Sequence, residues 1–307
     1  MKKQILFLFT GFFLNINAQF SPPPPSADQV TESDDVKLYD AHEIPEKVFS
    51  WNVKSLMIDG EQDFREIPGK IGNLKGLINF SLKGGSVATL PKEFSGLQNI
   101  RAISINSNEF VEIPKVIFKI PGLEYFEFLS YKIDQFPNEL GNLRNLKTLK
   151  LSKSLYWGGA ITNDKQVFKD LYLPASIGNL KKLERLSLQS NNLKKLPSEI
   201  GNLESLIELD LSYNSLESLP TTVSKLKKLE SVEVVRNKLK IFPKELYELE
   251  NLKSVSLKQN MIETIPPGIE KLRNLSSLDL TGSKLSNSSL LEIYKLENLV
   301  TLMLNDG

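Results

Sequence analysis

Few side chains in this sequence have the types and spacing that catalysis requires. The single histidine is His42, so neither a histidine-based triad nor a cluster of histidine metal ligands can form. The chain has no cysteine nucleophile and no Gly-x-x-x-x-Gly-Lys-Ser/Thr phosphate loop. The carboxylates of Asp210 and Glu233 could face each other on neighbouring strands, but solvated surface charge is the simpler interpretation. The sequence therefore predicts a protein that is not an enzyme and uses no cofactor or metal.

Aromatic and charged side chains suggest a different chemistry, the recognition of another protein. Tyr125 and Leu129 stand where other parts of the chain carry small or polar residues, and Tyr156 and Trp157 follow soon after. Exposed aromatic side chains are favourable anchors for a partner, and loops commonly carry them. The candidate contact residues are Tyr125, Leu129, Lys150, Lys153, Tyr156, Trp157, Arg185, Glu208, Asp210, Tyr213 and Arg236.

These residues are positioned by a repeat. Ten prolines recur at a spacing of 23 residues, with one gap of 37, which places a 14-residue insertion within residues 152–171. The prolines are at positions 45, 68, 91, 114, 137, 174, 197, 220, 243 and 266. A fixed period of this length is typical of a solenoid, in which function is sought on a repeating surface.

Each repeat mixes two apolar periods. In the unit that begins at Pro197, Leu209 and Leu211 have the two-residue spacing of a short strand. Ile200, Leu203 and Leu206 have the three-residue spacing of a short 3-10 or helical segment. This pattern predicts eleven strands, at 56–58, 80–82, 103–105, 126–128, 149–151, 186–188, 209–211, 232–234, 255–257, 278–280 and 302–304.

An asparagine seventeen residues after the proline marks the turn that follows each strand. It occurs at positions 108, 191, 214, 237 and 260, and such side chains are expected to stack into a hydrogen-bonded ladder. Tyr131 occupies the same position in one repeat, just before the insertion. Tyr156 and Trp157 therefore have two interpretations, as contacts for a partner or as a cover for a gap in the ladder.

The repeat resembles the leucine-rich repeat family, through its Leu-x-x-Leu-x-Leu-x-x-Asn-x-Leu core. The Leu-Pro-x-x-Ile-Gly-Asn-Leu extension is similar to the 23-residue type of plant intracellular Ras-group-related and bacterial proteins. The resemblance covers about residues 44–305. It implies an α/β solenoid, an arc with about eleven parallel strands on its concave face and short helical or 3-10 segments on its convex face. The family serves many binding roles, so it names no partner.

The N-terminus indicates export. Met1-Lys2-Lys3, the apolar residues 5–14 and Ala18 have the pattern of a signal peptide over residues 1–18, too short to span a bilayer. Residues 19–40 contain four consecutive prolines and several acidic residues, which predicts a flexible segment before a repeat domain at 41–307. Because exported animal and plant relatives usually carry cysteines, their absence points to a bacterial protein in the periplasm, on the cell surface or secreted.

The sequence thus predicts an exported, non-catalytic module that recognises a protein partner through its concave sheet and the 152–171 loop. The full chain has a formal net charge of +1, which becomes −1 when Lys2 and Lys3 leave with the signal, and this near-neutral balance favours neither nucleic acid nor an anionic membrane surface. Two alternatives remain. One is a structural or adhesive surface protein that self-associates through an uncapped C-terminal end. The other is an intracellular signalling scaffold, if the N-terminus is retained.

Overall fold

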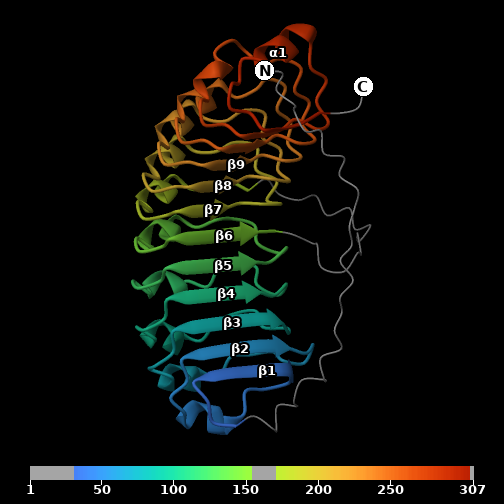
Figure 1. Cartoon of the computed structure of the whole chain (residues 1–307). Helices are drawn as coiled ribbons and strands as arrows, with labels where there is room; N and C mark the ends of the chain where they lie inside the picture. Colours follow the sequence, from blue (N-terminus) through green and yellow to red (C-terminus); the bar gives the residue numbers. More distant parts are fainter. Residues whose placement is uncertain (1–30, 154–170, 305–307) are drawn as a thin grey trace.

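A computed structural model describes residues 31–153 and 171–304 of the chain. In this part, twelve parallel strands form one sheet in sequence order, and 3-10 helices stack along its opposite side (Figure 1). The strands are β1 Asp35–Ala41, β2 Ser55–Gly60, β3 Asn79–Gly84, β4 Ala102–Asn106, β5 Tyr125–Leu129, β6 Thr148–Ser152, β7 Arg185–Ser187, β8 Glu208–Asp210, β9 Ser231–Glu233, β10 Ser254–Ser256, β11 Ser277–Asp279 and β12 Thr301–Met303. The predicted α/β solenoid is confirmed.

The sheet differs from the prediction at its beginning. All eleven expected strands are present, within about a residue of their predicted bounds, and β1 precedes them. Strand β1 lies almost wholly within residues 19–40, for which the composition predicted flexibility. Val36 and Leu38 alternate with exposed residues and are fully buried, and β1 pairs in parallel with β2. Two inward aliphatic side chains are therefore enough to start the sheet at Asp35, inside the acidic segment.

The prolines begin the convex segments. In the unit at Pro197, the proline carbonyl accepts a hydrogen bond from Ile200 N at 3.2 Å, and Leu203 N closes the turn on Ile200 O. The 3-10 helices are η2 Glu46–Ser50, η3 Gly69–Asn73, η4 Lys92–Gly96, η5 Ile117–Lys119, η6 Asn138–Asn142, η7 Ala175–Asn179, η8 Ser198–Asn202, η9 Thr221–Lys225, η10 Lys244–Glu248 and η11 Ile269–Lys271. The last convex segment, which lacks the proline, is an α-helix, α1 Asn287–Ile293, capped by Ser286. No helix in the described ranges is long and apolar enough to cross a membrane.

The asparagine ladder exists only after the insertion. Asn191, Asn214, Asn237 and Asn260 are buried and bond to the backbone of neighbouring repeats. Asn108, which we expected in the ladder, is exposed. Its neighbour Ser107 is buried instead and donates its hydroxyl to Val87 O at 3.2 Å. A serine one residue earlier in the turn therefore replaces the asparagine in this N-terminal repeat.

The two halves of the solenoid therefore contain two kinds of repeat. Strands β1 to β6 have five to seven residues, whereas β7 to β12 have three. In the second half, the residue before the ladder position adopts a positive φ, at Ser190, Tyr213, Arg236, Gln259 and Gly282. The insertion falls between the two kinds of repeat. One hydrophobic core nevertheless runs from Val36 to Leu302 without a break.

Candidate functional site

The concave face is hollowed at β5 to β9, next to the point where the insertion leaves the sheet. This sheet hollow has a volume of about 680 Å³. Five of the predicted contact residues line it, and they come from four neighbouring strands: Leu129, Lys150, Arg185, Glu208 and Asp210. The structure therefore brings together residues that are up to 81 positions apart in the sequence.

A row of side chains crosses the floor of the sheet hollow, because the strands pair in register. The central row runs through Ser104, Glu127, Lys150, Ser187, Asp210 and Glu233. Glu127, Ser187 and Glu233 line the hollow but were not among the predicted contacts. Each of these residues has the same offset from its repeat proline as Lys150 and Asp210 have. This offset could have identified them as contacts, since residues in equivalent positions lie side by side in a parallel sheet.

On the N-terminal side of the sheet hollow, Tyr125, Glu127 and Lys150 form one group. The Lys150 ammonium lies 5.8 Å from the centre of the Tyr125 ring and 3.9 Å from a Glu127 carboxylate oxygen. Ser104 Oγ donates to the other oxygen of Glu127 at 2.6 Å. Partial burial, followed by the Glu127 charge, raises the pKa of Tyr125 to about 12, so the phenol keeps its proton. The group offers an aromatic face, a cation and a hydroxyl donor.

On the C-terminal side, acidic groups dominate. Arg185 Nε lies 3.3 Å from a Glu208 carboxylate oxygen across β7 and β8. Asp210 is held by Ser187, by Gln189 and by the Ser212 amide at 3.0 Å. A carboxylate that accepts several hydrogen bonds is fixed in position and needs little reorganisation when a partner binds.

Glu233 lies beside Asp210 in the central row, and its pKa is raised by desolvation first and then by the charges of Asp210 and Glu208. A carboxyl whose pKa rises on folding holds its proton more tightly in the native state. Its contribution to stability is therefore least favourable at neutral pH and improves as the pH falls through the raised value toward the ordinary 4.5.

We therefore expect Glu233→Gln to stabilise the protein at pH 7 by up to about 0.5 kcal/mol, a small value because the side chain is exposed. The gain should disappear below about pH 4, where both forms are neutral. Urea denaturation across this pH range measures it. The exposed Glu112→Gln serves as the control and should change little at any pH. A Glu233→Gln variant that is less stable at pH 7 would contradict the repulsion.

Tyr213 and Arg236 lie at the edge of the sheet, in the turns of two successive repeats. The Arg236 guanidinium stacks on the Tyr213 ring at 5.3 Å, and its Nε donates to the Gln259 side chain. All three residues adopt φ between 52° and 58°, which is unfavourable for residues with a Cβ. The turn fixes this backbone conformation in Tyr213, Arg236 and Gln259, so their side chains stack on one another without a bound partner.

Three predicted contacts are not part of this surface as described. Lys153 is only 9% exposed, so it does not contribute to the accessible face. Tyr156 and Trp157 lie outside the described residues. In the Tyr131 repeat, Ser130 is buried and donates its hydroxyl to Phe110 O at 2.7 Å. Asn191 Oδ1 is buried and accepts no hydrogen bond from a described residue, so the ladder is incomplete at its first asparagine.

His42 Nδ1 lies 2.6 Å from Asp63 Oδ1 on the exposed N-terminal part of the solenoid, and this contact raises the pKa of the imidazole. No group of three or more histidine, cysteine, aspartate or glutamate side chains in the described chain could hold a metal ion.

Comparisons with known proteins identify the architecture. Residues 166–263 match the model of a leucine-rich repeat region, which covers the asparagine-ladder repeats. A search among curated protein sequences finds no match.

Solved structures share the fold. An internalin from Listeria monocytogenes is 17% identical, with a TM-score of 0.66 over 88% of this chain and 73% of that one. The plant peptide hormone receptor RGFR1, solved in complex with RGF2, is 22% identical, with a TM-score of 0.64 over 88% of this chain and 44% of that one.

Proposed function

We propose that this leucine-rich repeat protein is an exported, non-catalytic module that binds a protein partner through the sheet hollow and the insertion within residues 152–171. The carrying observation is the sheet hollow itself, where an otherwise small and polar sheet face gathers two cations and several carboxylates, with the Tyr125 ring beside Lys150 at its border. An open, extended face suits a protein surface better than a small molecule, which prefers an enclosed pocket.

The partner that fits this surface carries both charges. Lys150 and Arg185 are exposed on one side of the sheet hollow, whereas Asp210 and Glu233 are on the other. Complementary charges on a partner would orient it along the strands and would speed its association. Tyr125 on β5 supplies apolar contact area beside Lys150, at the N-terminal border of the sheet hollow, in a half-buried position that limits the entropy lost on binding.

Two variants test the proposal. The mature chain is immobilised and used to capture partners from its native source. Lys150→Glu combined with Arg185→Glu should lower capture about tenfold, because reversing two contact charges costs more than 1.4 kcal/mol. Tyr156→Ala combined with Trp157→Ala should also weaken capture without lowering the melting temperature. Lys228→Glu, an exposed residue outside the sheet hollow, is the matched control and should leave capture within about twofold.

The outcomes separate the interpretations. If Lys228→Glu weakens capture as much as the double reversal, the sheet hollow is not the binding surface. If the Tyr156 and Trp157 substitutions lower stability while capture is kept, the insertion has a structural role. Export is tested by mass spectrometry of the native chain: a first residue after Ala18 supports it, and a retained Met1 favours the intracellular scaffold.

One observation favours the self-association alternative. The last described repeat exposes Leu291, Tyr294 and Val300, at 65%, 77% and 65% of their surfaces. Within the described ranges, β12 pairs only with β11. Light scattering of the mature chain over a range of concentrations tests this alternative, since only self-association predicts species that grow with concentration.

A further inference from the structure

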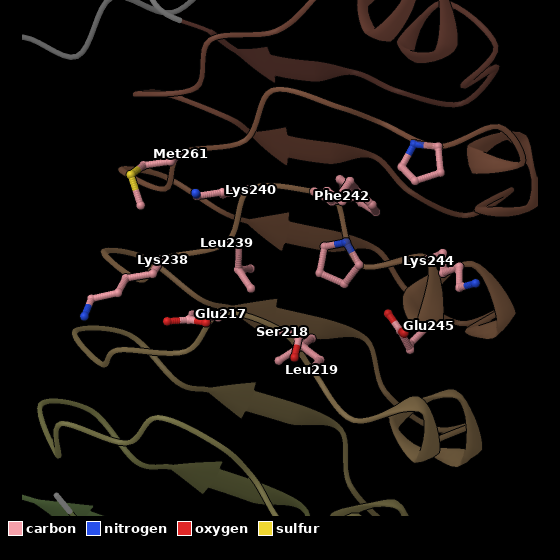
Figure 2. A pocket seen from close by; sticks show the side chains of 13 residues that line it. Glu217, Ser218, Leu219, Lys238, Leu239, Lys240, Phe242, Lys244, Glu245 and Met261 are labelled. Atoms are coloured by element: carbon pink, nitrogen blue, oxygen red, sulfur yellow. The ribbon is translucent and has the colours of Figure 1, made fainter.

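A second hollow lies away from the sheet, on the flank that joins the turns to the 3-10 helices. Figure 2 shows it between successive repeats, with Lys238 and Met261 toward the turn edge and Lys244 and Glu245 in the first turn of η10. This flank hollow has a volume of about 780 Å³ and shares no lining residue with the sheet hollow. A ligand bound there would therefore leave the concave face free.

The flank hollow forms where the backbone ladder between two repeats opens. Lys238 N donates to Leu216 O at 2.9 Å, but no backbone hydrogen bond within the described chain joins 217–219 to 240–242. On its other side, the 240–242 segment is paired. Phe242 N donates to Thr264 O and Glu263 N donates to Lys240 O, both at 2.9 Å, and Ile241 forms a parallel bridge with Thr264. A short extended segment is thus paired along one edge only.

The unpaired edge offers backbone groups to a ligand. Adjacent residues of an extended chain direct their N–H and C=O groups to opposite sides. Because Lys240 and Phe242 bond toward Thr264, Ile241 directs its N–H and C=O groups away from that repeat. Among the described residues, neither group of Ile241 forms a hydrogen bond. Such an edge is suited to adding an extended polypeptide as a further strand.

The wall behind this edge is rigid. Phe242 is fully buried and stacks on Tyr247 at 5.6 Å, and Tyr247 Oη donates to Pro266 O at 2.7 Å. These contacts tie three segments of neighbouring repeats together. The backbone edge at Ile241 is therefore held in place without a ligand, which reduces the entropy cost of binding.

The side chains around the flank hollow are apolar and charged, with three lysines against the two carboxylates of Glu217 and Glu245. Ile241 is 58% exposed and Met261 is 49% exposed, which is unusual for large apolar residues in this chain. Lys238, Lys240 and Lys244 surround them, and none forms an ion pair with a residue in the described ranges.

The whole flank of this half shares the basic character. We define the loop flank as residues 189–196, 212–219, 235–242, 258–265 and 281–286. It contains seven basic and two acidic residues, whereas the strands beside it, β7 to β11, carry Glu208, Asp210, Glu233 and Asp279 against Arg185 alone. Opposite charges therefore lie on adjoining faces of the same repeats.

We propose that the flank hollow, whose lining residues lie between Glu217 and Pro266, binds an extended, acidic segment of a partner protein that also carries apolar side chains. The segment pairs with the Ile241 backbone, its apolar side chains contact Ile241 and Met261, and its carboxylates meet Lys238, Lys240 and Lys244. A nucleic acid satisfies the lysines but has neither the peptide groups for the Ile241 edge nor aliphatic side chains for Met261. The observations therefore favour an acidic polypeptide.

The test uses the mature chain and a fluorescein-labelled nonapeptide, Glu-Leu-Asp-Phe-Glu-Leu-Asp-Phe-Glu, followed by fluorescence anisotropy. Two comparators are the same peptide with lysine at every acidic position and an oligo-dT of similar length. We expect the acidic peptide to bind at least about tenfold more tightly than either comparator. Its affinity should fall as salt rises from about 0.05 to 0.5 M.

Variants locate the binding. Lys238→Glu combined with Lys240→Glu should weaken the acidic peptide about tenfold, and Ile241→Thr should weaken it a few-fold through lost apolar contact. Lys92→Glu, whose side chain is 91% exposed on η4, is the matched control and should bind as the wild type does. Equal binding of the three probes, no binding of the acidic peptide, or an unaffected Lys238/Lys240 variant would each overturn the proposal. The Lys150/Arg185 double variant keeps this binding if the two surfaces are independent.

Discussion

Asn214→Ala lowers the free energy of unfolding by about 3 kcal/mol, the largest effect expected of a single polar substitution in this chain. The Asn214 Oδ1 atom accepts hydrogen bonds from Asn191 N at 3.1 Å and Leu193 N at 3.0 Å. Its Nδ2 donates to Leu188 O at 2.8 Å and Leu211 O at 2.9 Å. Alanine leaves Asn191 N, Leu193 N and Leu188 O without these partners, at a cost of about 1–3 kcal/mol for each unsatisfied group, whereas Leu211 O keeps its bond from Asn237 Nδ2.

The control for this substitution is in the same chain. Asn108 occupies the same position relative to its repeat proline but is exposed, because Ser107 has taken the buried place. Asn108→Ala should therefore change stability by less than about 0.5 kcal/mol. Chemical denaturation followed by circular dichroism measures both variants. Equal losses in the two, or a loss below about 1 kcal/mol for Asn214→Ala, would show that the ladder does not stabilise the C-terminal repeats.

Gly201→Ala is expected to destabilise the protein by about 2–3 kcal/mol, through overpacking and not through lost hydrogen bonds. Gly201 is buried in η8, which packs directly against η9. A Cβ at this position would lie 2.7 Å from Thr222 Cβ and closer still to the Thr222 carbonyl oxygen. Thr222 cannot retreat freely, because its hydroxyl bonds to Ser198 O at 2.6 Å. The close stacking of successive convex segments thus requires a glycine here.

A glycine in a more open repeat shows the contrast. In η4, a Cβ on Gly96 would meet only the Lys75 ammonium, at 3.6 Å, and a flexible lysine side chain can move away. Gly96→Ala should therefore be neutral or stabilising by about 0.5 kcal/mol, since alanine has the better helical propensity. Thermal unfolding of the two variants checks the pair. If both variants lose stability equally, the close approach of Thr222 does not explain the requirement for a glycine at position 201.

The fold could be predicted from the sequence because the repeats carry the same kinds of residue at the positions that determine their geometry. Pro197, Ile200, Leu203, Leu209 and Leu211 recur at fixed offsets, and stacking is the only way to bury all of them. The first strand was missed because Val36 and Leu38 are 14 and 16 residues after Pro22, the proline in phase with the repeat, not at the strand offsets of 12 and 14, and lie among acidic residues. The alternation of Val36 and Leu38 with polar residues becomes a strand through the pairing of β1 with β2.

The turns show what counting positions cannot predict. Asn108 and Asn214 have the same offset from a proline, yet one is exposed and the other is buried. In the longer strands of the N-terminal half, the ladder position shifts by one residue to a serine, as at Ser107 and Ser130. A one-residue shift exchanges the inward and outward side chains and carries no compositional signal.

The proximity of some candidate residues could be predicted from the sequence, but the shape of the sheet hollow could not. The register of parallel strands follows from the period, so the proximity of Lys150, Arg185 and Asp210 could be derived. The sheet hollow could not, because its depth depends on how side chains such as Gln189 and Glu127 turn toward neighbouring residues.

Site-specific cross-linking tests the central claim most directly. A photoreactive p-benzoylphenylalanine is placed at Ser187, in the sheet hollow, or at Ser205, in the segment between η8 and β8 outside it. Both serines are half-buried, so the two positions are matched in accessibility. With the captured partner present, position 187 should give the covalent adduct and position 205 should give none. An adduct from 205 alone would show that the partner binds elsewhere on the solenoid.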